Sequence, residues 1–234
     1  MNVAGAKVLV TGGSSGIGKA TAKALTTLGA KVAICGRHKE SITAAAAETG
    51  ATPFVADVSN EQDVVALIPR VVQALGGYDA VINNAGFGRF APLIGTTVDD
   101  MRSVWETNVL GATLVARESA KYFITQSYGN IINIGSTSGL RGSANGTAYS
   151  SSKFAVRSLT ECWRAELRKH NIRVMQVNPS EVLTDFANRA RGEEKPEDPS
   201  KLHASDIAAT IMNMLAQDDR AMIAEVSVWA TNPT

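Results

Sequence analysis

The chain has 234 residues, 44% of them apolar and 19% charged, which suits one α/β domain with a sizeable core and disfavours global disorder. Its formal net charge of +1 argues against nucleic acid or an anionic membrane as a partner, and no apolar run approaches the roughly 18 residues that span a bilayer. Two cysteines, Cys35 and Cys162, cannot build a disulfide framework, and no secretory leader precedes the first predicted strand, so we expect a soluble cytoplasmic protein.

Short apolar runs rich in β-branched residues alternate with helical periodicity along most of the chain. Seven strands are predicted, at residues 7–11, 31–35, 52–56, 78–82, 130–134, 172–177 and 222–229. Six helices are predicted, at 19–28, 41–48, 59–75, from 97 or 99 to about 126, 147–169 and 205–216. Ser59 and Gln62 predict a capping box at the start of the third helix. The alternation predicts a single domain over 1–234, a Rossmann-type doubly wound parallel sheet of about seven strands with helices on both faces.

The regular pattern breaks between about residues 180 and 204. This stretch contains Pro196 and Pro199, and a charged run extends from Arg189 to Lys201. We expect a mobile substrate segment here, with a short helix near Phe186. The charged run is interpreted as a solvated lid.

The residues with special chemistry follow the carboxyl ends of the predicted strands. They are Gly12–Gly18, Arg37, Asp57, Asn83–Gly86, Ser136 and Pro179. Ligands of doubly wound sheets bind beyond these ends, where the strand order reverses. The shared position predicts one binding crevice built from segments that are far apart in the sequence.

The first strand leads into a Gly-x-x-x-Gly-x-Gly turn at Gly12, Gly16 and Gly18, followed by a helix. Such glycines let the backbone approach a pyrophosphate at the helix N-terminus, although a plain glycine loop is the alternative. Arg37 follows the second strand, where NAD-selective sites carry a carboxylate. Its guanidinium therefore favours the 2′-phosphate of NADP(H) over NAD(H), the alternative being a solvated surface arginine. Asp57, after the third strand, could accept a hydrogen bond from the adenine amino group, the alternative being an acidic residue placed at a helix N-terminus for the helix dipole.

Tyr149 and Lys153 are four residues apart, so on a helix they lie on one face. An ammonium beside a phenol favours the phenolate, so we expect Lys153 to lower the pKa of Tyr149 below its usual value of about 10. Such a tyrosine can exchange a proton with a carbonyl or alcohol oxygen, and Ser136 could hold the same oxygen. A chance Tyr–Lys spacing on a soluble helix is the alternative. His170 and His203 have no partners at metal-ligand spacing, so no metal site is expected.

These motifs together resemble those of the short-chain dehydrogenase/reductase family, in its short single-domain type. The resemblance spans nearly the whole chain. It rests on Thr11-Gly12-x-x-x-Gly16-Ile17-Gly18, Asp57, Asn83-Asn84-Ala85-Gly86, Asn108, Ser136, Tyr149-x-x-x-Lys153 and Asn178-Pro179. Within the family, the chain is similar to bacterial 3-oxoacyl-[acyl-carrier-protein] reductases and related carbonyl reductases.

The resemblance implies a role for each matching residue. Tyr149 would be the general acid for ketone reduction or the base for alcohol oxidation, Lys153 would lower its pKa and bind the nicotinamide ribose, and Ser136 would orient the substrate oxygen. Asn108 would hold a relay water at a helix kink, and Asn83 would brace the sheet. The residues that would bind NADP(H) are Gly12, Ser14, Ser15, Gly16, Ile17, Gly18, Arg37, Asp57, Val58, Asn84, Ala85, Gly86, Tyr149, Lys153, Pro179, Val182 and Thr184.

The resemblance thus implies an NADPH-dependent oxidoreductase that interconverts a ketone, such as a 3-oxoacyl thioester, and a secondary alcohol. It also implies a homodimer or homotetramer formed through the two long helices. An NAD-dependent alcohol, sugar or steroid dehydrogenase is an alternative, and so is a dinucleotide-binding regulatory protein without chemistry. Phe87–Phe90, Leu140 and Phe186 are candidates for the pocket wall by position alone.

Two features depart from the family pattern. The family usually has Pro-Gly where this chain has Pro179-Ser180, followed by Glu181. Many relatives end in a glycine-rich tail, whereas this sequence ends with residues 229–234, Trp-Ala-Thr-Asn-Pro-Thr. The first departure lies beside the expected nicotinamide site and the second bears on oligomerisation.

Overall fold

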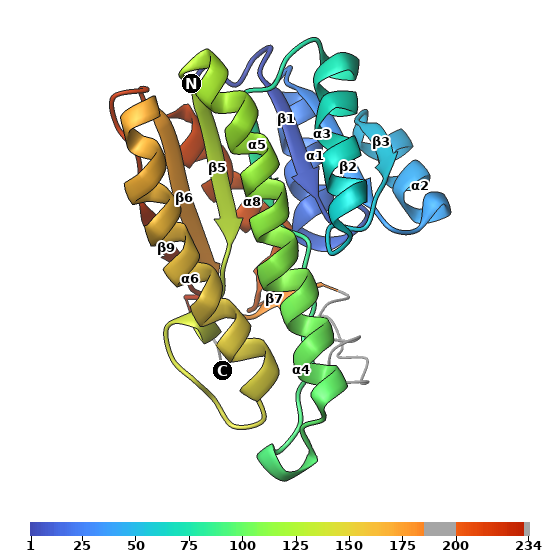
Figure 1. The fold of residues 1–234 in the computed structure, drawn as a ribbon, viewed down its shortest axis with the longest axis vertical. Coiled ribbons are helices and arrows are strands. Elements are labelled where there is room, and N and C mark those ends of the chain that lie inside the picture. Colours follow the sequence, from blue (N-terminus) through green and yellow to red (C-terminus); the bar gives the residue numbers. More distant parts are fainter. Residues whose placement is uncertain (185–199, 232–234) are drawn as a thin grey trace.

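One parallel sheet organises the structure, a computed structural model that describes residues 1–184 and 200–231 (Figure 1). Its seven strands lie in the order β3-β2-β1-β4-β5-β6-β9, and every neighbouring pair is parallel. They are β1 (Lys7–Thr11), β2 (Lys31–Gly36), β3 (Thr52–Val55), β4 (Ala80–Asn83), β5 (Gly129–Ile134), β6 (Ile172–Pro179) and β9 (Glu225–Val228). The predicted doubly wound fold is confirmed. The strand order reverses between β1 and β4, which pair with each other.

The sheet is buried on both faces because side chains alternate along each strand. Val8 and Val10 lie in the core beneath α1 (Gly16–Thr27), α2 (Lys39–Thr49) and α8 (Ala204–Ala216). Leu9 lies in the opposite core, beneath α3 (Glu61–Leu75), α5 (Ala112–Gln126) and α6 (Thr147–Leu167). In Figure 1, α5 and α6 lie in front of the sheet and α8 lies behind it.

The predicted capping box at Ser59 is wrong. The residue that caps α3 is Asn60, whose Oδ1 accepts a hydrogen bond from the Asp63 N–H at 3.1 Å. The hydroxyl and N–H of Ser59 both donate to Asp57 Oδ1, at 2.7 and 2.9 Å. Because the Asp57 carboxylate holds Ser59 in the preceding turn, the helix begins one residue later than a Ser59 cap requires.

The long helix predicted from residue 97 or 99 is continuous but contains a π-helical turn. Thr97 caps α4 (Val98–Trp105), η2 (Glu106–Gly111) is the π-helical turn, and α5 follows without a break. Such turns occur frequently at functional sites. Asn108 lies in the middle of this one.

The segment expected to be mobile lies largely outside the described residues, including Phe186, Arg189, Pro196 and Pro199. Its two sides are described: β7 (Val182–Leu183) pairs with β8 (Leu202–His203). Glu181 and Lys201 form an ion pair across the same position at 3.4 Å. Within the described ranges, no helix is long and apolar enough to cross a membrane.

Candidate active site

The glycine turn between β1 and α1 forms a bare backbone cradle. Gly12 and Gly16 have φ angles of 64° and 52°, in the region that favours glycine. A Cβ on Gly18 would collide with the carbonyl oxygen of Gly12, so α1 approaches the turn more closely than any side chain allows. The Ser15 side chain does not cap α1, which leaves the first N–H groups of the helix available to phosphate oxygens. The turn therefore fits the pyrophosphate of a dinucleotide.

The turn is joined to the end of β4 by side-chain hydrogen bonds. Asn84 Nδ2 donates to the carbonyl oxygens of Thr11 and Gly12 at 3.0 and 3.1 Å. Thr11 Oγ1 accepts from the N–H groups of Asn84 and Ala85, at 3.0 Å each. Asn84 thus holds the glycine turn with its side chain, and Thr11 is a structural partner to which the sequence assigned no role.

Arg37 and Asp57 face each other across the ends of β2 and β3. The guanidinium Nη1 lies 4.0 Å from Asp57 Oδ2, and the Arg37 side chain is 58% exposed. The neighbouring Val58 is buried, and a Cβ on Gly111 would lie 2.8 Å from its Cγ2. The structure therefore brings a largely exposed cation and a carboxylate together, as expected for the ribose and adenine end of the crevice.

Ser136, Tyr149 and Lys153 are brought together and buried at the end of β5. Their exposed fractions are 8%, 8% and 7%. Tyr149 makes a side-chain hydrogen bond to Ser136. Lys153 lies on the same face of α6, with Nζ 5.7 Å from the centre of the Tyr149 ring. Ser136 thus forms one cluster with two residues that follow it 13 and 17 positions later in the sequence.

The expected lowering of the Tyr149 pKa by Lys153 is wrong for this structure. Burial raises the pKa of Tyr149 to about 12, and the bond from Ser136 offsets only part of that effect. Lys153 Nζ donates to the carbonyl oxygen of Ile134 at 2.8 Å. Burial lowers the pKa of Lys153 to about 8. Helical spacing placed the two side chains on one face, but burial is the largest cause of both pKa shifts.

Asn108 links the π-helical turn to the end of β4 and to α6. Its Nδ2 donates to the Phe87 carbonyl at 2.9 Å and to Ser152 Oγ at 3.1 Å, while its Oδ1 accepts from the Phe87 N–H at 3.0 Å. Ser152 Oγ in turn donates to the Tyr149 carbonyl at 2.7 Å. A Cβ on Gly86 would lie 2.9 Å from Asn108 Oδ1. Sequence reasoning missed Ser152, which carries no motif signal apart from its place between Tyr149 and Lys153.

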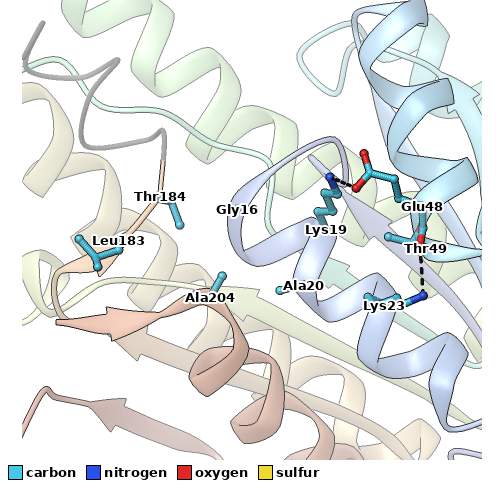
Figure 2. A pocket seen from close by; sticks show the side chains of 9 residues that line it. All are labelled: Gly16, Lys19, Ala20, Lys23, Glu48, Thr49, Leu183, Thr184 and Ala204. Carbon is cyan, nitrogen blue, oxygen red and sulfur yellow. Dashed lines mark hydrogen bonds and ion pairs between the residues drawn. The ribbon is translucent and has the colours of Figure 1, made fainter. Parts of the chain in front are cut away.

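Thr184 lies against the other side of the glycine turn. A Cβ on Gly16 would be 3.2 Å from Thr184 Cγ2. A cavity of about 460 Å³ opens beside this contact, between α1 and Leu183–Thr184 (Figure 2). On its far wall, Glu48 binds Lys19 at 2.5 Å and accepts from Lys23 Nζ at 3.1 Å through its backbone carbonyl. Ser136 and Tyr149 do not line this cavity.

A smaller cavity of about 130 Å³ lies near Tyr149. Its lining residues are Arg89, Phe90, Ala91, Thr96, Asp100 and Ala148. The Phe90 ring lies 5.3 Å from the Tyr149 ring, so the predicted wall segment Phe87–Phe90 does reach the cluster. Leu140 is partly exposed after η3 (Thr137–Gly139).

The remaining predicted positions lie around the same crevice. Pro179 ends β6 beside Val228, and Val182 lies in β7. Ser14 is partly exposed in the turn, whereas Ile17 packs against the core. Among residues 1–184 and 200–231, no three His, Cys, Asp or Glu side chains are grouped as metal ligands would be.

Comparison with known proteins defines the class. The family of short chain dehydrogenases matches residues 6–195. An uncharacterized oxidoreductase of Staphylococcus aureus is 34% identical over 223 residues, covering 94% of this chain and 95% of the relative. The 3-oxoacyl-[acyl-carrier-protein] reductase of Bos taurus is 36% identical over 179 residues, 76% of each chain.

Solved structures share the fold across nearly the full length. Levodione reductase matches with a TM-score of 0.89 and 29% identity, covering 97% of each chain. NAD⁺-bound xylitol dehydrogenase matches with 0.87 and 28%, covering 98% of this chain and 100% of that one. A metagenomic short-chain oxidoreductase in complex with NADP matches with 0.85 and 30%, covering 99% and 100%.

The chain therefore belongs to the short-chain dehydrogenase family. It is an oxidoreductase of the kind that acts on CH–OH groups with a nicotinamide dinucleotide.

Proposed function

We propose that the protein is an NADPH-dependent reductase that converts a ketone into a secondary alcohol, and catalyses the reverse reaction, with Tyr149 as the proton-transferring group. The observation that carries this proposal is the buried cluster of Tyr149, Ser136 and Lys153, which lies at the same edge of the sheet as the glycine turn. When bound, the cofactor supplies or accepts the hydride. The protein supplies binding, orientation and one proton.

The cofactor would be held along the carboxyl edge of the sheet. The backbone of the glycine turn and the start of α1 would bind the pyrophosphate. Lys153 would bind the nicotinamide ribose. The other residues proposed to contact it are Gly12, Ser14–Gly18, Arg37, Asp57, Val58, Asn84–Gly86, Tyr149, Pro179, Val182 and Thr184.

Tyr149 is the proposed proton donor. Burial raises its pKa to about 12, so the hydroxyl carries its proton at neutral pH but is a weaker acid than a free tyrosine, and donation to a carbonyl oxygen requires stabilisation of the phenolate that forms. The pKa of Lys153, lowered to about 8, leaves its ammonium largely protonated at pH 7. That charge would stabilise the phenolate which forms as Tyr149 gives up its proton. Ser136 would orient the substrate oxygen, and Asn108 would hold the relay water.

Arg37 supports the choice of NADPH. Its guanidinium is 58% exposed at the end of β2 and has only a 4.0 Å contact to Asp57, so it has capacity for a phosphate. Relatives of both cofactor classes exist, since xylitol dehydrogenase was solved with NAD⁺ and the metagenomic enzyme with NADP. The second candidate function is NAD-dependent alcohol dehydrogenation, which the similarity to NAD⁺-bound xylitol dehydrogenase favours.

The test is a screen of NADPH oxidation with 3-oxoacyl thioesters, diketones, aldehydes, quinones and steroid ketones. The similarity to 3-oxoacyl-[acyl-carrier-protein] reductase and levodione reductase gives the thioesters and diketones priority. Turnover of at least one ketone, faster with NADPH than with NADH, is expected. NADPH binding without turnover across the panel would favour a regulatory dinucleotide-binding protein.

We also propose a homodimer or homotetramer formed through the two long helices. Trp105, Leu110 and Phe154 are large apolar side chains on these helices that are 39%, 46% and 43% exposed, and such an interface would cover them. Sedimentation velocity of wild type and Phe154→Glu tests this proposal. A shift of the variant to monomer is expected, and a monomeric wild type would contradict it.

A further inference from the structure

A continuous chain of buried side-chain hydrogen bonds crosses the sheet directly beneath the Ser136–Tyr149 cluster. It begins at Asn83 on β4, whose Nδ2 donates to Asn133 Oδ1 on β5 at 2.9 Å. Asn133 Nδ2 donates to Thr160 Oγ1 on α6 at 2.7 Å, and that hydroxyl lies 2.9 Å from Gln176 Oε1 on β6. Gln176 Nε2 donates to Asn178 Oδ1 at 2.6 Å. These five side chains are at most 6% exposed.

This chain of hydrogen bonds ends at a charged pair near the surface. Asn178 Nδ2 donates to Glu225 Oε1 on β9 at 2.7 Å. Arg157 Nε, on α6, lies 3.2 Å from the same carboxylate oxygen. The Glu225 and Arg157 side chains are 29% and 40% exposed, so the pair connects solvent to the buried amides.

The carboxylate sets the direction of the bonds between Glu225 and Gln176. A carboxylate only accepts, so Asn178 must present its Nδ2 to Glu225 and its Oδ1 to Gln176. Gln176 must then present Nε2 to Asn178 and Oε1 to Thr160. The Thr160 hydroxyl also lies 2.7 Å from the Val156 carbonyl oxygen, so it faces two acceptors and can only accept from Asn133. The charge therefore fixes the two amides of β6, and the Thr160 hydroxyl fixes the amides of Asn133 and Asn83.

This chain of bonds contacts both halves of the candidate active site. A Cβ on Gly135, the residue before Ser136, would collide with Asn178 Oδ1 and lie 2.7 Å from Gln176 Nε2. Gly135 N–H also donates to the Val177 carbonyl at 2.8 Å. The backbone that carries Ser136 therefore rests on the amides of β6.

The other half is the helix that carries Tyr149. Tyr149, Lys153 and Arg157 are spaced four residues apart and Thr160 follows three residues later, so all four lie on one face of α6. At the other end of the chain of hydrogen bonds, Asn83 Nδ2 also donates to the Ala112 carbonyl at 3.3 Å. Ala112 directly follows the π-helical turn that contains Asn108.

We infer that Glu225 is a positioning residue. It acts through Asn178, Gln176 and Thr160 to fix the position of Ser136 relative to the face of α6 that carries Tyr149. The inference rests on the proposed function only where it predicts turnover. The hydrogen-bond chain itself can be tested without a substrate.

The test compares one variant that breaks the chain of hydrogen bonds and one that removes its charge with one matched control. Thr160→Val removes the central hydroxyl without changing the side-chain shape. Glu225→Gln keeps the length and an acceptor oxygen, but it removes the charge that strengthens the bonds from Asn178 and Arg157 and that fixes the direction of the Asn178 amide. Tyr78→Phe is the control, because it removes another buried hydroxyl bond, at 2.7 Å to Ser119, in the core beneath α3 and α5. Thr160→Ser retains the hydroxyl and should restore wild-type behaviour.

Hydrogen exchange of peptides covering residues 134–140 and 147–154 is the substrate-free readout. Losing one net hydrogen bond in Thr160→Val, or the charge assistance of one in Glu225→Gln, should speed exchange by about three- to tenfold, and Tyr78→Phe and Thr160→Ser should not. On the best carbonyl from the screen, kcat should fall by a similar factor while the KM for NADPH stays constant.

Equal exchange in these peptides for Thr160→Val, Glu225→Gln and Tyr78→Phe would overturn the inference. So would a fall in kcat for Tyr78→Phe as large as that for Thr160→Val, since the effect would then follow global stability. Failure of the proposed function has a separate signature: no carbonyl is turned over, or Tyr149→Phe is fully active, while the exchange pattern persists.

Discussion

Replacing Arg37 by alanine should weaken NADPH binding selectively. The guanidinium lies 4.0 Å from Asp57 Oδ2, and both side chains are partly exposed, so their mutual attraction is worth no more than about 1 kcal/mol. A charge-assisted hydrogen bond to a 2′-phosphate contributes about 1.5–3 kcal/mol. We therefore expect Arg37→Ala to raise the Kd for NADPH by about 10- to 150-fold. NADH lacks the phosphate, so its Kd should change less than about threefold.

The assay is titration of each reduced cofactor by its fluorescence, at low and high salt. The loss for NADPH should shrink at high salt, because screening already weakens the exposed contact. Lys39→Ala is the matched control, since Lys39 is an exposed cation in the first turn of α2, two residues after Arg37. An equal loss of affinity for both cofactors, or an equal effect of Lys39→Ala, would refute the role of Arg37.

Three further variants test the scaffold. Gly18→Ala should lower the free energy of unfolding in urea by about 1–3 kcal/mol and abolish NADPH binding, because its Cβ would collide with the Gly12 carbonyl. Gly142 lies in open space, so Gly142→Ala should change neither the unfolding free energy nor NADPH binding. Lys153 releases its proton at about pH 8 in the native state and above pH 10 in the unfolded chain. Between about pH 8 and pH 10 the unfolded chain therefore binds more protons than the native state, so Lys153 makes the free energy of unfolding rise with pH in this range. The same pH slope in Lys153→Met would contradict a lowered pKa for buried Lys153. Thr97→Ala should cost about 1 kcal/mol by removing the α4 cap, and an unchanged urea midpoint would show that the cap contributes nothing.

The architecture was predictable because each strand is short, apolar and bounded by turn residues. The places of Gly12, Arg37, Asp57 and Ser136 followed from one rule, that parallel strands present their carboxyl ends at the same edge. The capping residue of α3 was not predictable, because Ser59 and Asn60 are both good caps. Only the Asp57 carboxylate, which binds Ser59, decides between them.

The electrostatics of the site could not be read from spacing. Four residues on a helix place Tyr149 and Lys153 together, but spacing does not show that Lys153 Nζ turns to the Ile134 carbonyl or that both groups are buried. The hydrogen-bond chain from Asn83 to Glu225 was also hidden, because its members come from four strands and one helix. The stretch predicted to contact the substrate, residues 180–204, lies largely outside the described ranges.

The proton-transfer role of Tyr149 is the central claim, and Tyr149→Phe tests it most directly. The variant removes the hydroxyl and keeps the ring that packs against Phe90 at 5.3 Å. On the best carbonyl from the screen, kcat should fall by at least about 100-fold, the low end of what acid–base groups supply, while the Kd for NADPH stays within about threefold of wild type. Near wild-type turnover in Tyr149→Phe, with NADPH still bound, would contradict the account.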